Sequence, residues 1–285
     1  MPFAKALVWS IVATGLSLAC GFGAYYAGHW IGLVTVRWMS LIARTVFLIA
    51  LTAFAIWVLR VKINKRSWTG MALPPLQTGR LLFGMLCGVI VMGSLFGIQY
   101  LLGWLHFAGI SHEARSDTTQ WVVTLIAIPM SIGLGFSEEL VFRGYVFQTL
   151  GEQVPVWIAC LMMGTIFAFM HFTLPNFGLG FVLGVVPIST LFLVLRYVTG
   201  SLWFPIGFHA MWDWTEAYFL GIKGSDPCLI QFTQTGPSFW VGSGQTTESG
   251  ILYIAASLAL IAIALIYGRV AGKSAPWANT LTPEG

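Results

Sequence analysis

The chain has 285 residues, of which 57% are hydrophobic and only 8% are charged. Soluble globular proteins carry about a quarter charged residues, because water must solvate their surface. This composition therefore excludes a water-soluble enzyme, and its hydrophobicity excludes a disordered chain. The formal net charge of +4 does not indicate a nucleic-acid partner, because basic residues in a membrane protein mainly set its topology.

Long apolar runs predict an all-α fold, a polytopic membrane helical bundle with about eight transmembrane helices. The runs are continuous over roughly twenty residues, which suits helices rather than the alternating strands of an outer-membrane barrel. In chain order, the expected helices cover residues 6–26, 44–58, 81–104, 121–150, 155–172, 181–198, 202–220 and 251–267. A basic loop separates the second helix from the third, and a loop rich in Gly, Ser, Thr and Gln precedes the eighth.

The distribution of basic residues predicts that both termini are cytoplasmic. An even number of spans places the two termini on one side, and basic residues gather on the cytoplasmic side. With cytoplasmic termini, the basic residues expected inside are Lys5, Arg60, Lys62, Lys65, Arg66, Arg80, Arg196, Arg269 and Lys273. Those expected outside are Arg37, Arg44, Arg115 and Lys223.

Charged side chains within apolar runs are the candidate functional residues, because each costs at least ~2.5–3.5 kcal/mol to insert. Late in the fourth run lie Glu138, Glu139 and Arg143. Glu139 and Arg143 are four residues apart and share a helical face, which favours a structural ion pair. Glu138 lies about 100° round the helix, away from this pair. An unpaired carboxylate in an apolar site suits a general base.

Two later runs each carry histidine. Phe167 and His171 lie late in the fifth run, and His209 and Asp213 lie in the seventh. His171 by itself is typical of a core or interface residue, and Phe167 of packing. Asp213 lies one turn from His209 and is expected to orient it or to join the site, although a buried pair that only stabilises helix packing is an equal alternative.

The three clusters together predict one intramembrane site. The fourth and fifth helices form an antiparallel hairpin in which Glu138 and His171 are about equally far from the turn. The seventh helix brings His209 and Asp213 to the same depth. Two imidazoles and a carboxylate can hydrolyse a bond through a metal-activated water or through direct carboxylate base catalysis.

These segments resemble the type II CAAX prenyl endopeptidase family, which also covers bacteriocin-processing and immunity-type (Abi) membrane proteins. The family pattern is EExxxR, FxxxH and HxxxN or HxxxD. Here the three motifs read Glu138-Glu139-x-x-x-Arg143, Phe167-x-x-x-His171 and His209-x-x-x-Asp213, in that order on separate apolar helices. The stretch Glu248-Ser-Gly-Ile also resembles the family's entry to its last helix.

The resemblance implies a membrane endoprotease that acts on a membrane-associated protein, with prenylated C-termini as the substrates of some members. It divides the chain into N-terminal membrane helices with a basic cytoplasmic loop (1–80), a catalytic membrane domain (81–270) and a polar tail (271–285). Carried over to this chain, Glu138 activates the attacking water and His171 assists. His209 and Asp213 stabilise the oxyanion, and Glu139, Arg143 and Phe167 support the pocket.

A zinc cofactor is an open alternative to a metal-free mechanism. His171 and His209 would be its ligands, but no HExxH motif is present, and we favour the metal-free glutamate mechanism. Some relatives have Asn at the position of Asp213, and an ionised Asp213 cannot donate a hydrogen bond. Either oxyanion stabilisation falls more on His209 or Asp213 must be protonated.

Two other functions compete with proteolysis. A non-catalytic bacteriocin-immunity protein or membrane scaffold could use the same fold. A transporter could use Glu138 and the histidines as a proton relay.

Overall fold

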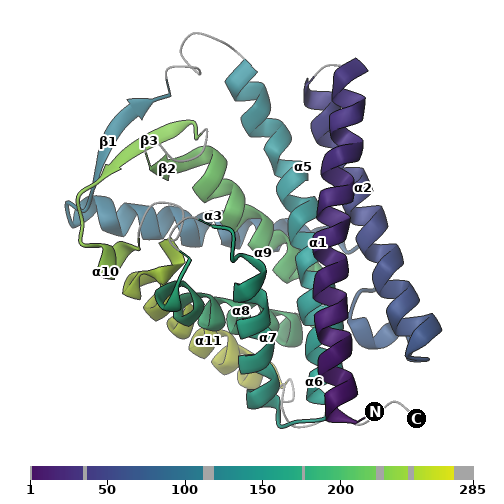
Figure 1. Cartoon of the computed structure of the whole chain (residues 1–285). Coiled ribbons are helices and arrows are strands. Elements are labelled where there is room, and N and C mark those ends of the chain that lie inside the picture. Colours follow the sequence, from purple (N-terminus) through teal and green to yellow (C-terminus); the bar gives the residue numbers. More distant parts are fainter. Residues whose placement is uncertain are drawn as a thin grey trace.

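A computed structural model of the protein describes residues 2–34, 37–111, 119–174, 177–222, 228–242 and 247–272. The described residues form a helical bundle with one small sheet at its side (Figure 1). The predicted fold class is confirmed. Arg115 and Lys223, which were expected outside the membrane, and residues 273–285 of the predicted tail, including Lys273, lie outside the described residues.

Each predicted helix has a counterpart in the structure. The helices are α1 (Phe3–Val34), α2 (Arg37–Trp57), α3 (Thr78–Leu101), α5 (Thr119–Glu139), α6 (Phe147–Gly151), α7 (Val156–Met170), α8 (Leu179–Thr199), α9 (Trp203–Trp214), α10 (Ser238–Val241) and α11 (Ile251–Val270). Segments of π-helix at Val58–Ile63, Leu140–Val146 and Thr215–Phe219 extend α2, α5 and α9. Short 3₁₀ turns lie at Thr69–Met71 and Thr247–Ser249.

Six described helical stretches are long and apolar enough to cross a membrane. They comprise α1, α2, α3, α5 with α6, α8 and α11. The apolar helix α7 has 15 residues and is shorter than the usual span. These helices support an integral membrane protein, as the composition predicts.

Several helix boundaries differ from the predicted ones; the first helix, for example, was expected to end at residue 26, but α1 extends to Val34. The second helix was expected to begin at Arg44, but α2 begins at Arg37, so Arg44 lies about two turns inside the helix. The seventh was expected to reach residue 220, but α9 ends at Trp214 and is continued by a π-helical turn. Hydropathy locates apolar runs but does not register the hydrogen bonds that end a helix, so such boundaries shift by a few residues.

A three-stranded sheet was not predicted. Strands β1 (Leu105–Ile110), β2 (Leu220–Ile222) and β3 (Ile230–Gln234) form a sheet in the order β1-β3-β2. β3 pairs antiparallel with β1 and parallel with β2. These strands are too short to show a hydrophobic period, and β1 pairs with β3 across more than one hundred residues of sequence.

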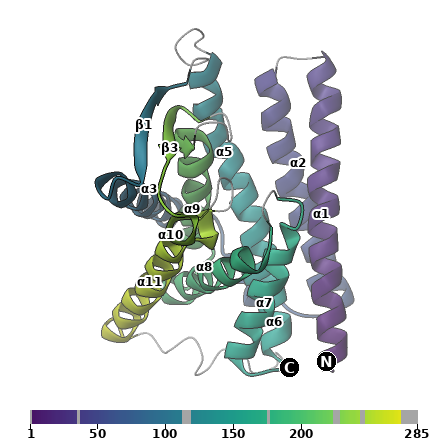
Figure 2. The same ribbon diagram turned by 60° about the vertical axis from the view of Figure 1, so that its left-hand side comes forward.

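Helix α9 lies among α3, α5 and α8, while α1 and α2 form an adjacent pair on the other side of α5 (Figures 1 and 2). Glycines allow α3 and α9 to approach closely. A Cβ atom on Gly84 would lie 2.1 Å from the carbonyl oxygen of Phe204, and one on Gly207 would lie 2.2 Å from that of Leu81. This close packing fixes the helix that carries His209.

Candidate active site

A buried ion pair joins the end of α5 to the π-helical segment that follows it. Glu139 Oε1 lies 2.8 Å from an Arg143 Nη atom, and both side chains are fully buried. The guanidinium also donates to the carbonyl oxygen of Ser189 at 3.3 Å and lies over the rings of Phe167 and Phe192. Arg143 is therefore compensated by charge, hydrogen bonds and aromatic faces together.

The same oxygen of Glu139 also binds His209. His209 Nδ1 lies 2.8 Å from Glu139 Oε1. An ionised carboxylate only accepts hydrogen bonds, so Nδ1 carries a proton and donates it to Glu139. Glu139 thus sets the orientation of the imidazole as well as pairing with Arg143.

The other nitrogen of His209 lies near two carboxylates. Nε2 is 3.5 Å from Glu138 Oε2 and 3.5 Å from Asp213 Oδ2. Glu138 and His209 are only 6% and 5% exposed, whereas the side chain of Asp213 is 30% exposed. The imidazole therefore connects a buried structural carboxylate on one side to two less enclosed carboxylates on the other.

This arrangement refines two sequence predictions. The i, i+4 spacing suggests Asp213 as the residue that orients His209, yet the short contact comes from Glu139 on another helix. Sequence reasoning also gave Glu139 only a structural role with Arg143. The spacing of the motif reveals contacts within one helix but not those between helices.

His171 lies at the C-terminal end of α7, beside the same aromatic cluster. Its Nδ1 is 3.0 Å from the carbonyl oxygen of Phe167, and its ring meets the Phe167 ring edge-on at 5.1 Å. The Phe167 ring also meets the His209 ring edge-on, at 6.3 Å. The ring of Phe167 therefore contacts both imidazoles, a position more specific than the general packing expected of it.

Glu248 lies just before α11, near the two histidines. Desolvation raises the pKa of the Glu248 carboxyl above its ordinary value, and the electrostatic fields of His171 and His209 partly oppose this shift. A Cβ atom on Gly184 would lie 1.9 Å from the Glu248 carbonyl oxygen, so this glycine lets α8 approach the segment. Sequence reasoning noted Glu248 only as the start of the last helix.

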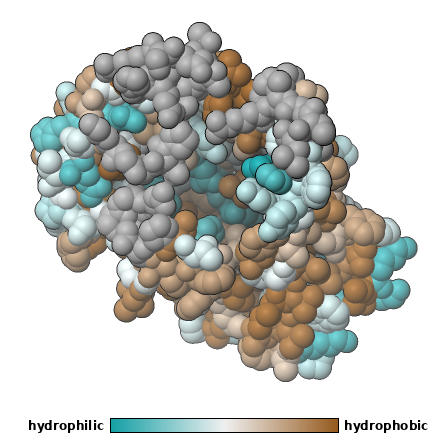
Figure 3. All heavy atoms as spheres, turned by 45° about the horizontal axis from the view of Figure 1, so that its top comes forward, coloured by the Kyte–Doolittle hydropathy of each residue, from teal (hydrophilic) through white to brown (hydrophobic). Residues whose placement is uncertain are grey.

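A cavity of about 310 Å³ opens beside this cluster, and Asp213 is one of its lining residues. The other lining residues come from α1, α2, α5 and the π-helical turn after α9. Figure 3 shows hydrophilic side chains in a hollow at the centre of one face of the molecule, with apolar helical surface beside it.

Residues 119–215 match the model of a family described as "Type II CAAX prenyl endopeptidase Rce1-like". This segment is therefore similar to that family. It contains Glu138, Glu139, Arg143, Phe167, His171, His209 and Asp213. The resemblance predicted from the three motifs is thereby confirmed, and it supports a CAAX-protease-type fold for an intramembrane endopeptidase.

The chain is also similar to the uncharacterized protein YyaK of Bacillus subtilis (strain 168). The two are 24% identical over 225 residues, which cover 75% of this chain and 71% of YyaK. The Rce1-like segment implies a peptidase, whereas the similarity to YyaK names no activity.

The side chains of the Rce1-like segment do not fit the predicted zinc alternative. Within the described ranges, no three His, Cys, Asp or Glu side chains gather in an arrangement that could hold a metal ion. Both predicted ligands have Nδ1 engaged, His209 by Glu139 and His171 by a backbone carbonyl; this leaves Nε2 of each ring available and does not itself exclude a metal. A catalytic zinc site needs three protein ligands.

Proposed function

We propose that this protein is an intramembrane endopeptidase that hydrolyses a peptide bond of a membrane-associated protein. One observation carries the proposal: Glu138 and Asp213 both lie 3.5 Å from Nε2 of a buried His209 whose Nδ1 is held by Glu139. A carboxylate beside an oriented imidazole can activate water and stabilise the charge that develops on the substrate.

In the proposed reaction, Glu138 is the general base. It accepts a proton from a water molecule as the water oxygen attacks the substrate carbonyl carbon. Glu138 then delivers this proton to the leaving amine as the C–N bond breaks, so the carboxylate is regenerated. His171 faces the same site with Nδ1 held by the Phe167 carbonyl, which leaves Nε2 to accept a hydrogen bond from the water.

His209 stabilises the oxyanion in this scheme. Its Nδ1–H is engaged by Glu139, so a protonated Nε2 is the donor available to the substrate oxygen. The neighbouring carboxylate of Asp213 stabilises the imidazolium form. Asp213 itself, when ionised, accepts hydrogen bonds and does not donate to the oxyanion.

The substrate class follows from the setting of the site and from the resemblance. A site enclosed by apolar helices favours a substrate that is itself held in the bilayer. The description of the matching family names CAAX prenyl endopeptidases. We therefore propose a C-terminal, prenylated or similarly anchored peptide segment as the substrate, with the lipid bilayer as the medium.

The direct test replaces Glu138 with Gln, which keeps the size of the side chain but cannot accept the proton. Because general base catalysis contributes about 10²–10⁴-fold, we expect kcat to fall by about that factor. The measurement is cleavage of a quenched fluorescent peptide that ends in a farnesylated cysteine and three apolar residues, with the protein in nanodiscs. A parallel comparison of protein termini in membranes from cells with wild type or Glu138→Gln would identify the natural substrate.

Glu152→Gln is the matched control. Glu152 pairs with Arg66 at 2.9 Å, away from the cluster, so this variant should retain wild-type turnover. If folded Glu138→Gln cleaves the peptide at the wild-type rate, Glu138 is not the base. If wild type cleaves no peptide and leaves no new termini in cells, a non-catalytic immunity or scaffold function replaces the protease.

A further inference from the structure

Arg44 is a cation within an apolar helical stretch, Met39–Ile63, that is long enough to cross a membrane. Ionisable groups at such positions are costly, so they usually have a partner or a function. Arg44 forms no ion pair with a described carboxylate, and its Nε–H has no hydrogen-bond partner among the described residues. Its guanidinium lies 4.5 Å from the ring centroid of Tyr25, a cation–π contact that uses none of its N–H donors.

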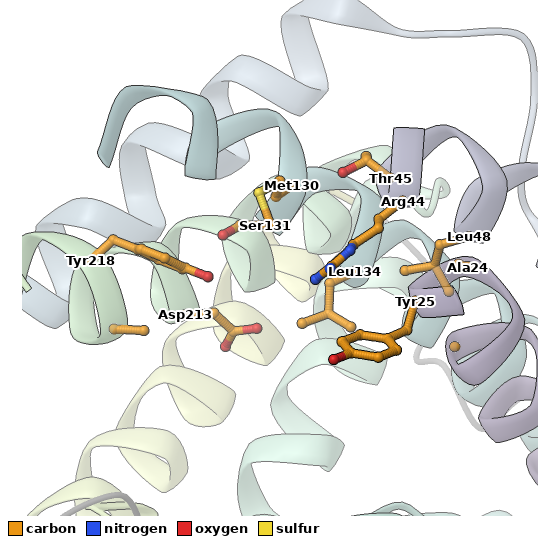
Figure 4. A pocket seen from close by; sticks show the side chains of 12 residues that line it. Ala24, Tyr25, Arg44, Thr45, Leu48, Met130, Ser131, Leu134, Asp213 and Tyr218 are labelled. Carbon is orange, nitrogen blue, oxygen red and sulfur yellow. The ribbon is translucent and has the colours of Figure 1, made fainter. Parts of the chain in front are cut away.

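The side chain of Arg44 points into the cavity that also contains Asp213. Figure 4 shows Arg44 and Tyr25 on one side of the cavity and Asp213 and Tyr218 on the other. The remaining lining is mainly apolar, with Gly21, Ala24, Leu48, Met130, Leu134 and Ala217. The cavity therefore has one basic end, an apolar wall, and an acidic end that belongs to the candidate active site.

The backbone of α1 constrains the position of Arg44. A Cβ atom on Gly28 would lie 2.1 Å from Arg44 Cγ, so the arginine stem occupies the space left by this glycine. Ser40, one helical turn before Arg44, donates a hydrogen bond to the Gly28 carbonyl oxygen. The two helices thus pack around the stem and direct the guanidinium to the cavity.

We propose that Arg44 binds the free terminal carboxylate of the peptide substrate, with the last residues of the peptide in the cavity. This inference rests on the proposed function. A guanidinium matches a carboxylate in charge and in its two-pronged geometry. The carboxylates of Glu138 and Asp213 repel the same group, so the peptide lies with its charged end at Arg44 and an upstream peptide bond toward His209.

The size and lining of the cavity agree with a short, apolar peptide end. Its volume of about 310 Å³ is at the lower limit of small-molecule pockets. The aliphatic lining residues can contact apolar side chains of the peptide. Arg44 would thereby restrict the enzyme to peptide bonds close to a C-terminus, since an internal segment offers no carboxylate at that distance.

The test measures binding separately from turnover. Two farnesylated fluorescent peptides, identical except for a terminal carboxylate or a terminal amide, are titrated against Glu138→Gln protein in phosphatidylcholine nanodiscs. A charge-assisted hydrogen bond to Arg44 can raise the affinity by about tenfold. We therefore expect the acid peptide to bind at least about tenfold more tightly than the amide peptide. Arg44→Gln in the same background should remove this preference, and Arg44→Lys should retain part of it.

Arg80→Gln is the matched control, because Arg80 is exposed at the start of α3 and binds Gln77. The amide peptide reports whether an Arg44 variant is folded, since its affinity should not change. Equal affinity for acid and amide, or no binding of either, overturns the proposal. If wild type still cleaves both peptides in that case, the proposed protease function is retained and only the role of Arg44 is rejected. If the acid binds more tightly but neither peptide is cleaved, the protease function is rejected and the role of Arg44 in binding is retained.

An anionic lipid offers the same chemistry through its phosphate. The titration is therefore repeated in nanodiscs that contain phosphatidylglycerol. If this lipid abolishes the preference for the acid peptide and the effect depends on Arg44, the cavity binds a lipid headgroup and the carboxylate assignment is wrong. If the preference persists, the terminal carboxylate is the ligand.

Discussion

At the scale of single residues, Glu139 connects the structural and the chemical parts of the site. One of its oxygens lies 2.8 Å from both Arg143 and His209, while the other is buried without a hydrogen-bond partner among the described residues. Neither neighbour can lose this carboxylate without leaving a buried donor unpaired. Glu139 is therefore expected both to stabilise the fold and to fix the orientation of the His209 imidazole.

Removing the Glu139 carboxylate should lower the free energy of unfolding more than removing the Glu138 carboxylate. Because breaking a buried ion pair on one side costs about 3–5 kcal/mol, we expect Glu139→Ala to lower the free energy of unfolding by about that amount. Glu138→Gln should change it by less than about 1 kcal/mol, because glutamine keeps the size of this buried side chain and can still form hydrogen bonds, so it creates neither a cavity nor an unpaired buried charge. Tryptophan fluorescence during thermal unfolding in detergent measures both. Equal unfolding midpoints for the two variants would contradict the assignment of a stabilising role to Glu139 and a catalytic role to Glu138.

At the scale of elements, the contact between α3 and α9 determines where His209 and Asp213 lie. A Cβ atom on Gly88 would lie 2.4 Å from the carbonyl oxygen of Phe208, the residue just before His209. Membrane helices that approach this closely need small residues at the contact, because backbone atoms cannot yield. The glycines of α3 are thus as important for the site as the residues of α9.

Gly88→Ala should therefore impair both stability and catalysis. Because overpacking costs about 1–3 kcal/mol, we expect a lower unfolding midpoint and reduced turnover of the fluorescent peptide. Gly93→Ala on the same helix is the matched control, since no atom lies within 4 Å of its Cβ position. The control should keep wild-type turnover and gain slightly in stability from its higher helix propensity. Similar losses in both variants would show that helix α3 as a whole, not this contact, is sensitive.

At the scale of the whole molecule, the sheet brings together two loops that the sequence places on one side of the membrane. β1 follows α3, and β3 lies in the loop before α11. Among the basic residues used to predict this topology, Arg196 is only 3% exposed and donates to the carbonyl oxygens of Arg143 and Gly70, so it contributes to the packing as well. Without Arg196 and the intramembrane Arg44, the basic excess remains on the same predicted side.

The orientation of the termini is a prediction that labelling can test. With the four native cysteines replaced by Ser, one new cysteine is placed at Ser67 in the basic loop or at Thr233 on β3; both positions are exposed. With cytoplasmic termini, a membrane-impermeant maleimide should label Thr233→Cys in intact cells and Ser67→Cys only after lysis. The reverse pattern would place the termini outside.

The sequence alone determined the class of protein, the helical spans and the identity of the candidate residues. Long apolar runs require helices in a bilayer, and charged residues within those runs are too costly to be accidental. The motifs around Glu138, Phe167 and His209 could therefore be recognised from residue spacing within single helices. Residue spacing did not predict the helix ends, which depend on individual backbone hydrogen bonds. It also did not predict the sheet, which depends on hydrogen bonds between distant segments.

Only the tertiary structure decided which residues meet. It gave His209 its orienting partner on another helix, Glu139, and it brought Arg44 from the N-terminal helices to the cavity that contains Asp213. Neither contact has a signature in residue spacing. Helical periodicity fixes neighbours along one helix, whereas the close packing permitted by glycines such as Gly84 and Gly207 fixes neighbours between helices.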